Sequence, residues 1–174
     1  PTRLSAGAIA NIFESILDPD NPKKLATAFK VWRRKVRENL ESWKLIEYYA
    51  HLIERFEFLE DYLYPHNTTD WVSNQKEEYT EDATAELTAF REIVHKWHRA
   101  ASLTPDQFVL TIAQDLELDA IELATVHKIA LLMRNLQDMH PEWSLEEMKG
   151  ELVDITKSLR RFENLSDEVE GFDP

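Results

Sequence analysis

Two histidines stand at a spacing that suits metal binding. Glu92-Ile93-Val94-His95 matches the E-x-x-H spacing of carboxylate di-iron bundles, and His98 follows one helical turn later. Such a centre needs a second E-x-x-H on a facing helix. Glu47 and His51 share a face but do not fit that motif, and His127 has no matching Glu. We therefore predict no metal site and expect these histidines to face solvent or to lie at helix ends.

Paired carboxylates suggest a second chemistry, the hydrolysis of nucleotide pyrophosphates. All-α enzymes of that class hold Mg²⁺ with E-x-x-E and E-x-x-D pairs, which place two acids on one helix face. The acids with these spacings are Glu54, Glu57 and Glu60, and then Glu151 with Asp154. Because the chain has 33 Asp and Glu, such spacings arise by chance. A solvated acidic face is the favoured interpretation, and a Mg²⁺-dependent pyrophosphatase is kept as an alternative.

Basic residues are concentrated between positions 23 and 37, where no acid occurs. They are Lys23, Lys24, Lys30, Arg33, Arg34, Lys35 and Arg37. Lys30, Arg33, Arg34 and Arg37 share one broad helix face, so their charges are expected to lie outside and are the candidate contacts to DNA phosphates. Alternatively, the charges form exposed ion pairs with the acidic third helix. The formal net charge of −13 favours that alternative, because it repels nucleic acid at long range.

Composition excludes several other kinds of site. The glycines stand at positions 7, 150 and 171, so the GxxxxGK[ST], GxGxxG and GxSxG motifs are absent, and no catalytic or cofactor-binding residue is predicted. The lack of cysteine excludes disulfides, thiolate zinc sites and thiol nucleophiles, and suits a reducing compartment. No apolar run approaches the about 18 residues of a membrane span. We expect a cytoplasmic domain with no membrane partner and no signal peptide.

Apolar residues recur at helical spacing, which predicts an all-α fold: a single domain of about seven helices over residues 1–163, followed by an acidic linker over 164–174. The first three helices carry these stripes: Ile9, Ile12, Phe13 and Ile16; Leu25, Phe29, Trp32 and Val36; Trp43, Ile46, Tyr49, Ile53 and Phe56. Asn21 and Pro22 are expected to start the second helix, and the third is expected from about Glu41 to Leu63.

Four further helices are predicted after residue 80. Their stripes are Leu87, Phe90, Val94, Trp97 and Ala101; Phe108, Ile112 and Leu116; Leu123, Val126, Ala130 and Met133; Met148, Leu152, Ile155, Leu159 and Phe162. Thr104 with Gln107 and Ser144 with Glu147 have the spacing of capping boxes, and Asp119 is a candidate cap of the sixth helix.

Several stretches resemble bacterial UvrD/Rep-like superfamily 1 helicases, notably cyanobacterial ones. They are residues 59–66 (LEDYLYPH) followed by Asp70-Trp71, residues 103–116 (LTPDQFVLTIAQDL), residues 124–130 (ATVHKIA), Arg160-Arg161-Phe162 and Gly171-Phe172-Asp173-Pro174. The resemblance covers most of the chain and is to the helical accessory subdomain called 2B, which is inserted in the second motor domain.

The resemblance implies a regulatory piece of an ATP-dependent DNA helicase that unwinds DNA in repair or replication. The ATP and Mg²⁺ sites would lie in the parent chain, outside these residues. The implied partners are the remaining helicase domains in cis, and a DNA backbone or a protein. One departure concerns the glycine-bearing helix-hairpin-helix with which the best-known members touch duplex DNA, since no Gly-x-Gly occurs here. A non-enzymatic interaction module of an unrelated protein is the further alternative.

Overall fold

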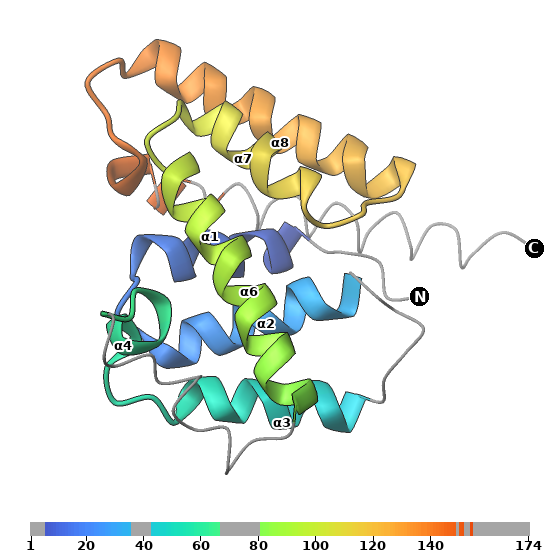
Figure 1. Ribbon diagram of the computed structural model, residues 1–174. Coiled ribbons are helices and arrows are strands. Elements are labelled where there is room, and N and C mark those ends of the chain that lie inside the picture. Colours follow the sequence, from blue (N-terminus) through green and yellow to red (C-terminus); the bar gives the residue numbers. More distant parts are fainter. Residues whose placement is uncertain (1–5, 36–42, 67–80, 149, 152–153, 155–174) are drawn as a thin grey trace, which may run out of the picture.

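A computed structural model describes residues 6–35, 43–66, 81–148, 150–151 and 154. Within these residues the chain forms helices and no strand, which confirms the all-α fold (Figure 1). The helices are α1 (Ala6–Leu17), α2 (Pro22–Lys35), α3 (Trp43–Glu54), α4 (Leu59–Leu63), α6 (Glu81–Ala100), α7 (Pro105–Gln114) and α8 (Ala120–Met139). None of the helices in this part of the chain is long and apolar enough to span a bilayer.

Two helix starts depend on the side chains that the sequence predicts as caps. Asn21 Oδ1 accepts hydrogen bonds from the backbone N–H groups of Lys23 and Lys24 at 3.1 and 3.2 Å, directly before α2. Asp119 Oδ1 accepts from the N–H of Glu122 at 2.8 Å and so caps α8. These bonds satisfy donors that the first turn of a helix leaves without a partner, and both predictions are confirmed.

The two predicted capping boxes have different outcomes. The Thr104 side chain makes no capping bond, so that prediction is wrong; its carbonyl instead accepts from the Phe108 N–H at 2.9 Å. The Ser144 N–H donates to the Glu147 carboxylate, which is one half of the predicted box. That bond lowers the pKa of the Glu147 carboxyl, because it favours the charged form. The predicted seventh helix beyond position 154 and the linker over 164–174 lie outside the described residues.

The predicted third helix is two helices. α3 ends at Glu54, and α4 begins at Leu59 after a turn in which the Phe56 N–H donates to the Ile53 carbonyl at 3.2 Å. The turn directs the Phe56 ring inward, where it stacks on Tyr62 with 4.8 Å between centroids. The prediction of one continuous helix is therefore wrong. The break between α3 and α4 allows both the Phe56 and the Tyr62 ring to lie in the core. Trp43, predicted in the apolar stripe, is exposed.

α6 runs across the molecule from α3 to the pair formed by α7 and α8 (Figure 1). Its predicted stripe is confirmed as core at Leu87, Phe90, Val94 and Trp97, whereas Ala101 follows the helix and is half-buried. Phe90 is at the centre of this stripe. Its ring centroid lies 5.1 Å from that of Phe29, 5.4 Å from that of Trp32 and 6.2 Å from that of Trp97. The contacts among these aromatic rings therefore pack α2 against α6.

Candidate functional site

The basic helix α2 holds the predicted DNA contacts, and one of them is in the core. Arg33 is 2% exposed; its Nε lies 2.7 Å from Glu86 Oε2 on α6, and its Nη2 donates to Oε1 at 3.0 Å. The expectation that Arg33 faces solvent is therefore wrong. α2 packs against α1 and α3, and α6 reaches it through Phe90 and Glu86. The buried face of α2 is therefore wider than its apolar stripe and includes Arg33. A guanidinium in that position needs a buried acid, which Glu86 supplies.

Two further cations of α2, Lys30 and Arg34, lie against α3. Lys30 Nζ is 3.1 Å from one carboxylate oxygen of Glu47, and Arg34 Nη2 is 3.8 Å from the other. The alternative interpretation of the basic residues was ion pairing with the third helix. It is confirmed for Lys30 and Arg34. Arg37, the fourth candidate contact, lies outside the described residues, and so does the side chain of Lys35.

Because Lys30 and Arg34 already face Glu47, we expect the double variant Lys30→Ala/Arg34→Ala to bind DNA with the wild-type affinity and salt dependence. Two lost phosphate contacts would instead reduce the slope of log K against log [salt] by about 0.9 each. Titration of labelled duplex and single strands at several salt concentrations measures this slope. Glu47→Gln is the matched control, because it leaves both cations in place without their carboxylate. A lower slope in the double variant would contradict the prediction.

The histidines connect α4 to α6. His95 donates from Nε2 to the carbonyl of Leu63, and the Tyr64 hydroxyl hydrogen-bonds to His98 Nδ1 at 2.7 Å. Tyr64 also stacks on His95, with 4.5 Å between ring centroids. Burial, with a smaller contribution from His95, lowers the pKa of His98. The expectation that these histidines face solvent or lie at helix ends is confirmed for His98, which is in the last turn of α6, and is wrong for His95, which is half-buried before that turn. Both hold the end of α4. The described residues contain no metal-binding group of three or more His, Cys, Asp or Glu.

The carboxylates of the pyrophosphatase alternative do not share a helix. Glu54 is the last residue of α3, Glu57 lies in the turn that follows, and Glu60 belongs to α4. This set therefore lacks the common helix face that the Mg²⁺ motif requires. Glu151 and Asp154 are helical and exposed, but residues between them are outside the described part of the chain.

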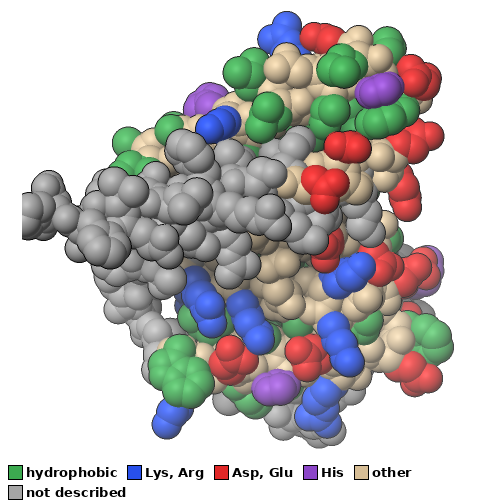
Figure 2. All heavy atoms as spheres, turned by 180° about the vertical axis from the view of Figure 1, so that it is seen from behind, with side chains coloured by type: hydrophobic (Ala, Val, Ile, Leu, Met, Phe, Trp, Pro, Cys, Tyr) green, Lys and Arg blue, Asp and Glu red, His purple; other side chains and the backbone are tan. Residues whose placement is uncertain are grey.

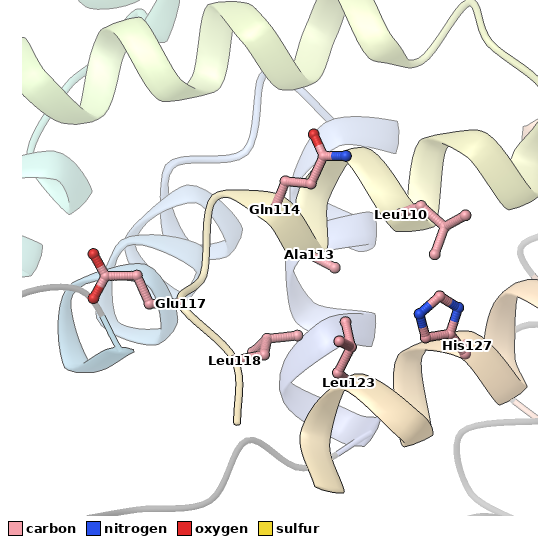
Figure 3. A pocket seen from close by; sticks show the side chains of 7 residues that line it. All are labelled: Leu110, Ala113, Gln114, Glu117, Leu118, Leu123 and His127. Carbon is pink, nitrogen blue, oxygen red and sulfur yellow. The ribbon is translucent and has the colours of Figure 1, made fainter. Parts of the chain in front are cut away.

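A groove between α7 and α8 is a candidate site that the sequence did not indicate. Its volume is about 370 Å³. It is lined by Leu110, Ala113, Gln114, Glu117, Leu118, Leu123 and His127. Figure 3 shows Leu110 of α7 facing His127 of α8 at one end, with Leu118 and Leu123 at the other. The side chains that face one another across the groove are aliphatic except His127, and the Gln114 and Glu117 side chains point away from it (Figure 3).

The rim of this groove has two unusual features. Leu123 and the neighbouring Ile121 are 41% and 54% exposed, so the prediction that Leu123 belongs to the core is wrong. Leu123 is turned toward the groove, while Val126, Ala130 and Met133 form the buried face of α8. In addition, Glu117 has a φ of 47°, the only positive value at a non-glycine residue in the described part of the chain. A side chain in this left-handed conformation costs about 1–2 kcal/mol.

The balance of charge differs between two segments of the chain. Residues 22–55 contain nine Lys and Arg and four Asp and Glu, whereas residues 81–148 contain five and thirteen. In Figure 2, most of the visible Lys and Arg side chains lie on the lower half, which α2 and α3 form. No Lys or Arg occurs from position 100 to 127, the stretch that builds most of the groove.

Comparison of the chain with protein-family models, with curated proteins and with solved structures gives no match. The interpretation of both surfaces therefore depends on the geometry of this chain. One is the face of α2, where the described cations at Lys30, Arg33 and Arg34 have acidic partners. The other is the α7–α8 groove, where aliphatic side chains remain accessible.

Proposed function

We propose that the chain is the helical accessory domain of a UvrD/Rep-like superfamily 1 DNA helicase, which regulates the motor through protein contacts and has no ATP site of its own. ATP and Mg²⁺ would bind to the motor domains. The accessory domain would swing as a rigid body against the motor and so tune unwinding.

The observation that carries the proposal is the position of the segments that resemble the family. In the described residues these segments contribute contacts that join α4, α6 and α7. The Tyr62 hydroxyl donates to the Leu87 carbonyl at 2.5 Å, and the Trp97 indole N–H donates to Asp115 at 3.1 Å. Tyr62 and Asp115 both lie in the resembling segments. A resemblance that includes such contacts supports a common fold more strongly than one confined to surface residues.

The pairing of the α2 cations supports regulation through protein contacts. Arg33 is committed to Glu86 in the core, and Lys30 and Arg34 lie against Glu47. A domain that clamps duplex DNA would leave such cations accessible to phosphates. The acidic surface of residues 81–148 suits a cationic protein surface better than DNA.

The test has two parts. The purified chain should neither bind nor hydrolyse ATP, with or without DNA, and the coding sequence around it should encode a P-loop upstream and a helicase motif just downstream. In the full-length protein, deletion of this domain should keep DNA-stimulated ATP hydrolysis and change the rate of duplex unwinding. ATP turnover by the chain alone, or flanks without motor motifs, would overturn the proposal.

A second candidate function is a non-enzymatic interaction module of an unrelated protein. The accessible aliphatic groove between α7 and α8 favours it, because such a groove suits a partner helix whatever the parent protein. Flanking sequence without motor motifs, combined with a protein partner that binds this groove, would support this candidate instead.

A further inference from the structure

We infer that Tyr64 is a site of covalent modification by small activated acyl donors, at which the Tyr64 hydroxyl is the nucleophile and His98 is the base that takes its proton. The inference goes beyond the proposed function and does not depend on it. It rests on the geometry where the end of α4 meets the last turn of α6, on the exposure of Tyr64 and on a comparison with a second tyrosine.

The Tyr64 hydroxyl and the His98 imidazole already have the arrangement of a nucleophile and its base. The hydroxyl oxygen lies 2.7 Å from His98 Nδ1. This separation is inside the range of about 2.6–3.2 Å within which a base can take the proton of a nucleophile. A neutral imidazole with its proton on Nε2 presents Nδ1 as an acceptor, so the hydroxyl donates. The proton that Tyr64 loses on reaction is therefore already directed at the base.

Other contacts hold the tyrosine in this position. Its ring stacks on His95, with 4.5 Å between centroids and 12° between the ring planes, and His95 Nε2 donates to the carbonyl of Leu63. The Tyr64 N–H donates to the Glu60 carbonyl at 2.8 Å, which fixes the backbone of the same residue. His98 belongs to the regular helix α6. Because both groups are fixed, the reaction loses little freedom in bringing them together.

Tyr64 is accessible to a small reagent. It is 46% exposed, whereas the hydroxyl of Tyr62 is buried and donates to the Leu87 carbonyl. The Tyr64 ring lies against two histidines of α6, so it cannot enter the deep cleft of a modifying enzyme without leaving its place. These conditions favour a small donor that reaches the hydroxyl where it stands and that needs no base of its own.

The reaction transfers an acyl group and releases the leaving group of the donor. The Tyr64 oxygen attacks the acyl carbonyl carbon, and the bond from that carbon to the leaving group breaks with its electron pair on the leaving group. The hydroxyl proton goes to His98 Nδ1 and then through solvent to the leaving group, which returns the imidazole to its neutral form. The product is a tyrosine ester, which cannot donate to His98. The modification therefore removes one contact between α4 and α6.

The surroundings of the pair keep the base neutral. Tyr64 at the end of α4 and His95 on α6 are the titratable groups that face His98, and Arg99 acts on Tyr64. Burial, with a smaller contribution from His95, lowers the pKa of His98, so this imidazole can accept a proton at neutral pH. Burial also raises the pKa of Tyr64, which Arg99 partly offsets. The Tyr64 phenolate is therefore scarce at neutral pH.

Tyr48 is the matched comparison within the same chain. It is 44% exposed, and in the described part of the chain its hydroxyl has no hydrogen-bond partner. A tyrosine without a base reacts as its phenolate. Exposure alone then predicts that Tyr64 reacts no faster than Tyr48, because its raised pKa leaves little phenolate. With His98 as the base, Tyr64 is the faster of the two.

The probe is N-acetylimidazole, added to the full chain at neutral pH, and tandem mass spectrometry of digested samples follows the acetylation of both tyrosines with time. We expect Tyr64 to react at least about tenfold faster than Tyr48, since a positioned base typically contributes about 10²–10⁴-fold in enzymes. His98→Phe keeps a ring against Tyr64 but removes the base, and it should lower the rate at Tyr64 to that of Tyr48 or below. His127→Phe replaces a histidine of α8 that lies outside this cluster, and it should leave the Tyr64 rate unchanged.

The pH dependence of the wild type gives a check that needs no variant. The rate at Tyr64 should level off above the pKa of His98 and fall below it, because the protonated imidazole cannot accept a proton. Phenolate chemistry would instead raise the rate about tenfold with each pH unit up to a pH of about 10.

Three results would overturn the inference. They are acetylation of Tyr64 no faster than that of Tyr48, an unchanged Tyr64 rate in folded His98→Phe, and a Tyr64 rate that keeps rising about tenfold with each pH unit. Circular dichroism shows whether His98→Phe is folded. If it is not, the ratio of the two tyrosine rates and the pH profile of the wild type decide the question without it.

Discussion

Replacement of Glu86 by Gln is expected to lower the free energy of unfolding by about 3–5 kcal/mol, because it leaves the buried guanidinium of Arg33 without a compensating charge. Both side chains are nearly inaccessible, at 2% and 6% exposure. The change from Glu to Gln preserves size, so lost packing contributes little to the effect. Urea denaturation followed by circular dichroism measures the difference.

Two controls identify the charge as the cause. The double variant Arg33→Met/Glu86→Leu removes both buried charges and should recover most of the lost stability, as replacement of buried ion pairs by apolar residues often does. Lys30→Ala breaks an accessible pair on the same helix and should cost less than about 1 kcal/mol. A loss below about 1 kcal/mol in Glu86→Gln would contradict the prediction, since it would mean that water reaches Arg33.

Truncation of Phe90 to Ala is expected to cost about 3–5 kcal/mol, the ordinary range for a buried aromatic ring. The Phe90 side chain has 0% exposure and contacts rings of α2 and of α6 itself. Its removal opens a cavity at the junction of the two helices, and the rings around it can fill that space only in part. Thermal and urea unfolding of the variant measure the loss.

Phe58 is the matched control for Phe90, because it is the same residue type at 63% exposure. Phe58→Ala should change the stability by about 0.5 kcal/mol or less. Phe90→Leu keeps most of the buried volume and should cost less than the alanine variant. Equal losses in Phe90→Ala and Phe58→Ala would show that Phe90 is not the centre of the core.

Features that are determined by residues close together in the chain were predicted from the sequence. Asn21 and Asp119 accept the expected backbone bonds, since a cap acts within three residues of its own position. The stripe from Ile9 to Ile16 is buried as the helical period requires. The all-α class follows from the same period along the chain.

Features that depend on distant residues were not predicted. The burial of Arg33 requires Glu86, which is 53 positions away on a helix that crosses α2. The turn after Glu54 contains no Gly or Pro, so the helical spacing of apolar residues continues through it as far as Phe56. The break in the helix depends on the contact between Phe56 and Tyr62, which the local sequence does not show. Leu123 stands at a helical spacing from Val126, but whether it faces the core or the groove is decided by where α7 lies.

The charge of the chain differs from segment to segment. Residues 22–55 carry five more positive than negative charges, and residues 81–148 carry eight more negative than positive charges. Exposed charges that are farther apart than the Debye length, about 8 Å at physiological ionic strength, are largely screened from one another. A charged molecule near the surface therefore responds to the charge of the segment that it approaches more than to the net charge of −13.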